Sequence, residues 1–220
     1  MSYFITGTDT GVGKTLISRA LLQGFAAQGK RVAGFKPVAA GVDADGMNDD
    51  AKALLTASNI PLNYEQVNPY CLREAIAPHI AANRENVRIE LPRIVAAYRE
   101  LADQVDVVIV EGAGGFRVPL NETQDSAELA RELGLEIIVV VGMRLGCLNH
   151  ALLTVEAIHA RGLKLAGWVA NSVTDTMPVQ QENIAALKDR IAAPLLGVVP
   201  YMTKPDAEVA AGQMDIGRLL

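Results

Sequence analysis

The chain has 220 residues; half are hydrophobic and a fifth are charged, so it can build a large apolar core. A net charge of −5 argues against general binding to nucleic acid or to an anionic membrane, because no basic excess supplies the attraction. The two cysteines and three histidines give neither a disulfide framework nor zinc-ligand spacing. No secretory signal or membrane-length apolar run is visible. We therefore expect a reduced, soluble, cytoplasmic protein that binds no nucleic acid and no membrane.

Short aliphatic strands alternate with amphipathic helices along the chain, without a repeat or a linker. Strands are expected at 3–5, 31–36, 105–110, 136–141, 165–170 and 195–199. Helices are expected after position 15 and at 51–57, 91–103, 125–133, 146–161 and 179–191, with a small helix near the end. The turn-rich segment 60–90 gives the weakest pattern. The alternation predicts one α/β domain over 1–220, with a doubly wound, mostly parallel sheet flanked by helices.

Ligands of such a sheet bind at the carboxyl ends of its strands. In this chain those ends carry glycines or polar residues, which is where a site is expected. They are Gly7–Gly13, Lys36, Glu111, Gly142–Gly146, Asn171 and Pro200.

The segment 7–15 reads Gly-Thr-Asp-Thr-Gly-Val-Gly-Lys-Thr between the first strand and the first helix. This context is typical of a phosphate-binding loop, in which backbone N–H groups and the helix start face a polyphosphate. Lys14 would reach the outer phosphates and the Thr15 hydroxyl would bind Mg²⁺. The ordinary spacing places a glycine where Thr8 stands, so the loop is a lengthened variant. The alternative is a glycine-rich turn with an incidental lysine.

Two carboxylates are candidate Mg²⁺ ligands. Glu111 ends a buried aliphatic strand, where phosphate-binding-loop proteins place an acid that helps to hold the metal. The following Gly112, Ala113 and Gly114 would let a second backbone loop approach the phosphates. Asp50 is the weaker candidate, because Asp49 or Asp50 capping the helix 51–57 explains it equally well. For Glu111, the alternative is an exposed residue before a flexible turn.

Lys36 ends the second strand and would be a second cation near a triphosphate, suited to a reaction in which phosphate charge rises. A solvated lysine before a proline is the equally weighted alternative. Gly146, Cys147 and Asn149 open a helix after a strand, where free N–H groups could hold an anion such as a carboxylate. No histidine–acid pair accompanies Cys147, so a packed thiol is expected rather than a nucleophile.

Six motifs, in order along essentially the whole chain, resemble the dethiobiotin synthetase family. They are Gly-Thr-Asp-Thr-x-Val-Gly-Lys-Thr at 7–15, Lys-Pro-Val at 36–38, Val-Glu-Gly-Ala-Gly-Gly at 110–115, Gly-Cys-x-Asn-His-Ala at 146–151, Gly-Trp-Val-Ala-Asn at 167–171 and Pro-Leu-Leu-Gly-x-x-Pro at 194–200. The lengthened loop with Thr-Asp-Thr is specific to that family, which explains Thr8.

The resemblance implies an ATP- and Mg²⁺-dependent cyclo-ligase of biotin synthesis that joins CO₂ to 7,8-diaminononanoate. One substrate amine becomes a carbamate, whose oxygen attacks the γ-phosphate. The second amine then attacks the carbon of the mixed carbamic–phosphoric anhydride, expels phosphate and closes the ureido ring. The family's enzymes are homodimers with the substrate near the subunit interface.

The resemblance also implies roles for individual residues. Phosphates would be held by Gly11, Val12, Gly13, Lys14, Thr15 and Leu16, and Mg²⁺ by Thr15, Asp50 and Glu111. The adenine side of the nucleotide would meet Asn171, Ser172, Pro200, Tyr201, Met202 and Asp206. Lys14 and Lys36 would neutralise the transferring phosphoryl group, and the substrate would also meet Ala40, Gly146, Cys147 and Asn149.

The chain departs from the family's pattern at three places. Ala40 stands where a serine or threonine is usual, Gly11 replaces an acid of some members, and the helix 179–191 lacks a tyrosine, with Asn183 its nearest counterpart. The second interpretation is a dimeric partitioning or metal-cluster-carrier ATPase, but those proteins carry a lysine where this chain has Asp9. A cobyrinate-type amide synthase would need a further amidotransferase domain. A pure nucleotide-binding module would leave Lys36 and the Gly146 segment without a role.

Overall fold

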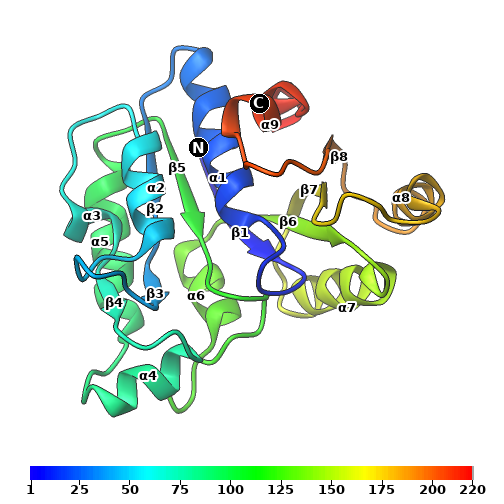
Figure 1. Ribbon diagram of the computed structural model, residues 1–220. Coiled ribbons are helices and arrows are strands. Elements are labelled where there is room, and N and C mark those ends of the chain that lie inside the picture. The colour runs from blue at the N-terminus through cyan, green and yellow to red at the C-terminus, as the bar shows by residue number, and fades with distance from the viewer. Residues whose placement is uncertain (220) are drawn as a thin grey trace.

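A six-stranded sheet with only parallel pairings runs through the molecule, which the computed structural model describes over residues 1–219 (Figure 1). Its strands are β1 (Ser2–Gly7), β2 (Val32–Phe35), β5 (Val107–Glu111), β6 (Glu136–Met143), β7 (Leu165–Ser172) and β8 (Leu195–Val199). Their spatial order is β2-β5-β1-β6-β7-β8, so the chain starts inside the sheet and winds outward in both directions. This confirms the doubly wound architecture expected from the alternation of strands and helices.

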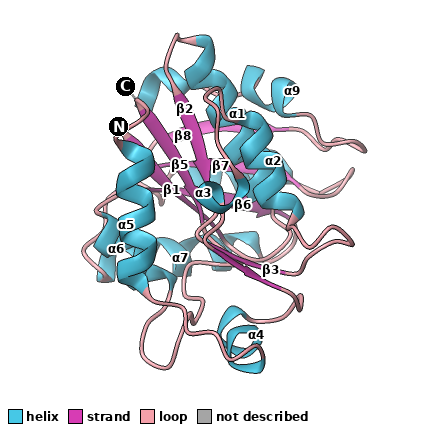
Figure 2. Ribbon diagram, turned by 90° about the vertical axis from the view of Figure 1, so that its left-hand side faces the viewer, coloured by secondary structure: helices cyan, strands magenta, loops and turns pink. Residues whose placement is uncertain are grey.

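Helices cover both faces of the sheet (Figure 2). They are α1 (Lys14–Ala27), α2 (Asp49–Ala57), α3 (Tyr64–Val67), α4 (Pro78–Arg84), α5 (Leu91–Ala102), α6 (Ser126–Leu133), α7 (Cys147–Ala160), α8 (Gln180–Lys188), α9 (Ala207–Gly212) and the 3₁₀ helix η1 (Ile216–Leu219). On one face α1 packs with α2, α9 and η1, and on the other the buried core is formed with α4 to α8. No helix within 1–219 is long and apolar enough to cross a membrane.

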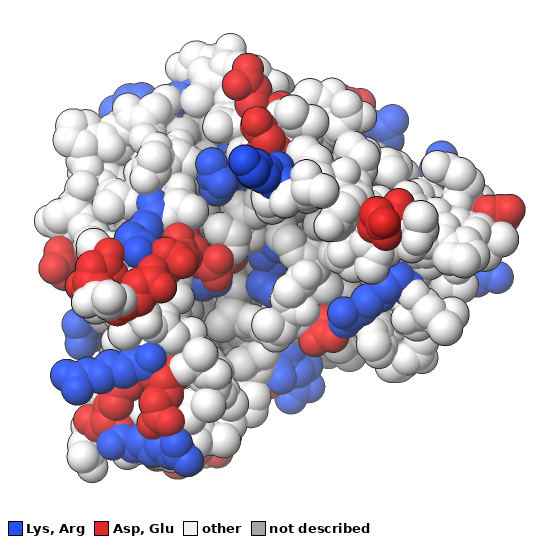
Figure 3. Space-filling model, in the orientation of Figure 1, with Lys and Arg blue, Asp and Glu red and all other residues white. Residues whose placement is uncertain are grey.

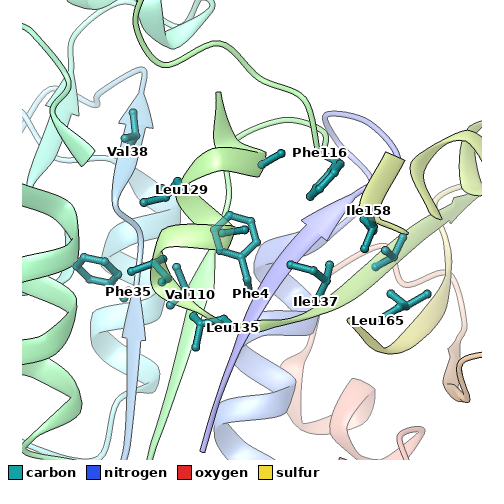
Figure 4. Close-up of a cluster of buried hydrophobic side chains, with 14 of the residues drawn as sticks. Phe4, Phe35, Val38, Val110, Phe116, Leu129, Leu135, Ile137, Ile158 and Leu165 are labelled. Carbon is teal, nitrogen blue, oxygen red and sulfur yellow. The ribbon is translucent and has the colours of Figure 1, made fainter. Parts of the chain in front are cut away.

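Side chains alternate between the two faces along each central strand, as the pleat requires. In β1, Phe4 enters the core shared with α5 to α7, whereas Ile5 enters the core shared with α1. In β5, Val110 and Ile109 divide in the same way. Figure 4 shows Phe4, Val110 and other apolar side chains of the first core meeting between the sheet and its helices. Burial on both faces explains why these strands are aliphatic throughout.

The segment 60–90, which gave the weakest sequence pattern, contributes one strand of a second, two-stranded sheet. Strand β3 (Val38–Ala40) pairs in parallel with β4 (Tyr70–Leu72), beside α4. The expectation of one sheet therefore missed this pair, because three-residue strands carry no readable alternation. The short helix α3 starts with a capping box, in which the side chains of Asn63 and Gln66 bond each other's backbone N–H. It packs against α2 and β2.

The start of α2 also differs from expectation. The cap is Asn48, whose side-chain oxygen accepts a hydrogen bond from the Ala51 N–H at 3.2 Å, whereas Asp49 and Asp50 already belong to the helix. Because Asn48 satisfies the helix start, the Asp50 carboxylate is not used as a cap. It is free to take part in the cluster described below.

Candidate nucleotide-binding and active site

The loop between β1 and α1 is shaped by glycine and held by β7. Gly11 and Gly13 have φ values of 73° and 92°, a region that favours glycine. The Asn171 amide nitrogen donates to the Val12 carbonyl at 2.8 Å, and a Cβ at Gly13 would collide with that amide. Asn171, 5% exposed, thus fixes the loop from the end of β7, which continues through Asn171 to Ser172.

Four polar side chains converge beside this loop: Thr15 of α1, Asp50 of α2, Glu111 of β5, and Lys36, which directly follows β2. Lys36 Nζ lies 2.6 Å from Glu111 Oε1 and 3.0 Å from Asp50 Oδ2. The Thr15 hydroxyl lies 2.6 Å from Asp50 Oδ1 and 3.0 Å from Glu111 Oε1, so its single proton can serve either carboxylate. Thr15 and Glu111, the most distant of these residues in the sequence, are 96 positions apart, and the fold brings them into contact. All of them lie at the carboxyl edge of the sheet, the expected place for a ligand.

The charges in this cluster support one another. Burial alone would lower the pKa of Lys36, but the facing carboxylates of Glu111 and Asp50 raise it above its ordinary value. Burial would raise the pKa of Asp50, but the Lys36 ammonium and the Thr15 hydroxyl hold it below its usual range. Lys36 therefore stays protonated and Asp50 ionised at neutral pH. Glu111 is fully buried, and the Lys36 ammonium is the counter-charge of its carboxylate.

Lys14 is the second buried lysine, and its pKa shifts in the opposite direction from that of Lys36. It is 7% exposed, and its ammonium donates to the Asp9 carbonyl at 3.1 Å. Burial, followed by repulsion from Lys36, lowers its pKa to about 8. The Asp9 carboxylate pairs with Arg144 and accepts a hydrogen bond from the Thr10 N–H at 2.7 Å. An anion placed against Lys14 would stabilise its charged form.

A cavity of about 770 Å³ opens above the cluster. Lys14, Thr15 and Lys36 contribute to its lining, together with Ala39, Ala40, Pro78 of α4 and Arg117. Figure 3 shows basic atoms deep in the hollow at the middle of this face, with acidic atoms along its left border. Arg117, which sequence reasoning missed, is held there by the Asp125 carboxylate at the start of α6. No motif distinguishes it, because its partner follows eight residues later across a loop.

The donor set fits Mg²⁺. Thr15, Asp50 and Glu111 offer one hydroxyl and two carboxylates, and Glu111 Oε2 is buried with no hydrogen-bond partner among residues 1–219. Mg²⁺ prefers oxygen ligands and usually takes one or two carboxylates, the remainder being water and substrate phosphates. A carboxylate oxygen left unpaired inside a protein is costly unless a cation meets it. The free oxygen of Glu111 is therefore the observation that favours a metal here.

Other residues expected at the site do not line this cavity. Asn171 and Ser172 end β7, Pro200, Tyr201 and Met202 follow β8, and Asp206 caps α9 by accepting from the N–H groups of Glu208 and Val209. Gly146, Cys147 and Asn149 lie at the start of α7. The Cys147 thiol is in the apolar core, as expected for a packed cysteine. The backbone N–H of Cys147 donates to the Arg144 carbonyl at 3.0 Å.

A second cavity, of about 780 Å³, lies at the amino edge of the sheet. Its charged lining residues are already engaged, since Lys164 pairs with Glu136 and Arg218 pairs with Asp215. It has neither a glycine-rich loop nor a strand carboxyl end. We therefore assign the functional site to the cavity beside the phosphate loop.

A glycine-rich loop from a parallel strand to a helix that opens with Lys14 and Thr15 defines the class of phosphate-binding-loop NTPases. A family model described as "AAA domain" matches residues 1–209. MinD, solved in the MinC:MinD complex of Aquifex aeolicus, superposes with a TM-score of 0.59 at 15% identity, covering 97% of this chain and 86% of that one. A ParA family ATPase of Chlorobium tepidum gives 0.59 at 14% identity, covering 96% and 90%. At these identities the likeness shows the fold alone.

Sequence relatives are much more similar. The ATP-dependent dethiobiotin synthetase BioD of Nitrosospira multiformis is 54% identical over 99% of this chain and 96% of its own length. The protein of the same name from Aromatoleum aromaticum is 54% identical over 96% and 95%, and that of a Janthinobacterium species 51% over 98% and 94%. The chain belongs to the dethiobiotin synthetase family. The resemblance seen in the sequence motifs is thereby confirmed.

The charge balance of the cluster predicts the effect of removing its cation. Lys36→Met leaves Glu111 and Asp50 facing each other without a counter-charge, so it should lower the free energy of unfolding by about 3 kcal/mol. Added Mg²⁺ should recover much of this loss, because it would bring positive charge to the same carboxylates. Urea unfolding of the variant and the wild type, with Mg²⁺ or with a chelator, measures both effects.

Lys52→Met is the matched control. Lys52 also bridges several carboxylates, those of Asp43, Asp45 and Asp49, but on the surface, where ion pairs contribute little. Its removal should change stability little, with or without Mg²⁺. A Lys36→Met protein that Mg²⁺ stabilises no more than it does the wild type would contradict the metal site.

Proposed function

We propose that the chain catalyses ATP- and Mg²⁺-dependent closure of the ureido ring of dethiobiotin from 7,8-diaminononanoate and CO₂, in biotin biosynthesis. The observation that carries this proposal is the Lys36 ammonium, 2.6 Å from Glu111 and open to the cavity beside the phosphate loop. A nucleotide-binding module needs no second buried lysine there. The names of the relatives at 51–54% identity support the same reaction.

The nucleotide binds through the loop. Backbone N–H groups from Gly11 to Leu16 surround the phosphates, and the start of α1 adds a favourable field for the anion. Gly112, Ala113 and Gly114 approach from the end of β5. Asn171, Ser172, the backbone from Pro200 to Met202 and Asp206 form the side that meets adenine. The position of Asn171 against the loop supports this arrangement, because it lies directly beside Gly13.

Thr15, Asp50 and Glu111 hold Mg²⁺, which supplies positive charge to the transferring phosphoryl group. Lys14 binds the outer phosphates from the loop side. Lys36, which pairs with Asp50 and Glu111, also lines the cavity, and the diamine enters there. The two lysines thus neutralise charge that builds up on the γ-phosphate during transfer.

The reaction needs orientation more than a strong base. An amine of the diamine adds to CO₂ and loses a proton, giving a carbamate that Lys36 holds against the γ-phosphate. A carbamate oxygen attacks the phosphorus as the bond to ADP breaks. The second amine then attacks the carbon of the mixed anhydride and loses a proton, while the carbon–oxygen bond breaks and phosphate leaves. Ala39, Ala40 and Pro78 give the cavity an apolar wall beside the place where the anhydride forms.

The carboxylate end of the substrate belongs at the start of α7, at Gly146, Cys147 and Asn149. In one chain this helix start does not line the cavity, and the neighbouring Leu145 is 99% exposed. Both observations support a homodimer in which a second copy completes the substrate site. We place the enzyme in the cytoplasm, where the free thiols of Cys71 and Cys147 stay reduced. The whole of 1–220 then acts as one domain.

A switch ATPase is the second candidate, since MinD and ParA share the fold. The loop argues against it. Asp9 stands where a partitioning-type ATPase is expected to carry a lysine, and here its carboxylate pairs with Arg144 of the same chain. An acidic side chain that is paired with an arginine of its own chain does not bring to a partner's nucleotide the positive charge that a lysine would bring.

Purified protein with MgATP, bicarbonate and 7,8-diaminononanoate should form dethiobiotin and ADP in equal amounts. ADP formation should depend on the diamine, because the carbamate and not water attacks the γ-phosphate. Lys14→Ala should lose most of this activity while keeping its fold, since it removes a cation that acts on the phosphates. ADP release that ignores the diamine would instead favour a switch ATPase.

The lowered pKa of Lys14 predicts proton uptake on nucleotide binding. Without nucleotide its pKa is about 8 rather than 10.5, so at about pH 9 most of the side chain is neutral. Bound phosphates favour the ammonium, so MgADP binding should take up close to one proton at about pH 9 and fewer at about pH 7. Calorimetry in buffers of different ionisation enthalpy measures the uptake. Equal uptake at both pH values would contradict the assignment of Lys14.

A further inference from the structure

The backbone of Lys36 is held on both sides by the segment 67–68. The Lys36 N–H donates to the Val67 carbonyl at 2.8 Å, and the Lys36 carbonyl accepts from the Asn68 side-chain amide at 2.6 Å. Asn68 is 3% exposed and does not line the cavity. It therefore acts on the backbone from which the Lys36 side chain starts, and not on a ligand.

The orientation of the Asn68 amide is fixed by its partners. Its nitrogen lies 2.6 Å from the Lys36 carbonyl and 3.1 Å from the Tyr70 carbonyl. Two carbonyl oxygens require two N–H donors, so the other side-chain atom must be the oxygen. That oxygen, 3.0 Å from the Tyr64 hydroxyl, can only accept, and the single proton of Tyr64 therefore points to Asn68.

The Tyr64 hydroxyl also reaches the start of α2. It accepts a hydrogen bond from the Asn48 backbone N–H at 2.8 Å, and its oxygen lies 3.3 Å from the Cys71 sulfur. Burial raises the pKa of Tyr64, so the hydroxyl keeps its proton. Asn48 is the residue that caps α2, and Asp50 follows two positions later. One hydroxyl thus connects the backbone of Lys36, through Asn68, with the helix start that carries Asp50.

We propose that Tyr64 and Asn68 are positioning residues for phosphoryl transfer, which set the Lys36 ammonium and the Asp50 carboxylate relative to each other. This role rests on the proposed function of the same site. Lys36 follows β2, whereas Asp50 belongs to α2. Asn68 bonds the Lys36 backbone, and Tyr64 bonds the backbone N–H of Asn48, the cap residue two positions before Asp50. A hydrogen-bonded pair fixes direction as well as distance, which apolar packing at the same place does not. Displacement of a reacting group by about 1 Å can cost 10²-fold in rate.

Tyr70, in the neighbouring strand β4, offers a matched control. Its hydroxyl accepts a backbone N–H, that of Glu90, at 3.0 Å, as Tyr64 accepts that of Asn48. Among residues 1–219, the Tyr70 hydroxyl makes no hydrogen bond to Lys36, Asn48 or Asp50. Tyr64→Phe and Tyr70→Phe therefore each remove one hydroxyl that accepts a backbone donor, but only the first touches the connection between Lys36 and Asp50.

The test compares the two full-length variants in diamine-dependent ADP release. Tyr64→Phe should lower kcat about tenfold or more relative to Tyr70→Phe, with the KM for ATP within about twofold, because the loop and the adenine side stay intact. The Mg²⁺ concentration for half-maximal rate should rise several-fold. Asn68→Ala should show the same pattern. Thermal unfolding also gives a reading without turnover: Mg²⁺ should raise the Tm of Tyr64→Phe less than that of Tyr70→Phe.

Equal kcat and equal Mg²⁺ response in the two tyrosine variants would overturn the positioning role. Loss of the fold in Tyr64→Phe but not in Tyr70→Phe would also overturn it, since the hydroxyl would then be structural. Absence of diamine-dependent turnover in the wild type would refute the proposed function instead. The Mg²⁺-dependent shift in Tm would then decide the positioning role on its own.

Discussion

The site depends on one buried ammonium shared by two carboxylates. Glu111 has no exposed surface, and its carboxylate pairs with the Lys36 ammonium 2.6 Å away. Asp50 meets the same ammonium from α2, so the charges join the ends of β2 and β5 to a helix start. Charge pairs of this kind contribute little net stability, but they fix where a cation lies. A phosphoryl-transfer site needs that fixed position, because it acts through preorganised charge.

The central part of this arrangement could be predicted from the sequence. Aliphatic strands alternating with helices determine a doubly wound sheet, and in such a sheet the carboxyl ends of the strands meet at one edge. That rule alone brings the Lys14–Thr15 loop, Lys36 and Glu111 together, as the structure shows. The motifs also identified the family that the relatives confirm, although the structural neighbours MinD and ParA share only the fold.

The supporting residues could not be predicted, because their roles depend on contacts between distant segments. Asn48, and not one of the acidic residues that follow it, caps α2. The Asp50 carboxylate can therefore bond to Thr15 and Lys36. The three-residue strands β3 and β4 are too short to show a period, so Asn68 looked like part of a turn. The place of Arg117 on the cavity wall depends on its ion pair with Asp125, which no sequence motif indicates.

The central claim is that the carbamate, held by Lys36, is the group that attacks the γ-phosphate. Labelling the CO₂ with oxygen-18 and analysing the released phosphate by mass spectrometry, within a turnover too short for exchange with water, tests it most directly. The account predicts that each phosphate carries one labelled oxygen, because the carbamate oxygen stays on phosphorus when the ring closes. Phosphate without label, formed together with ADP, would show that water is the nucleophile and would contradict the account.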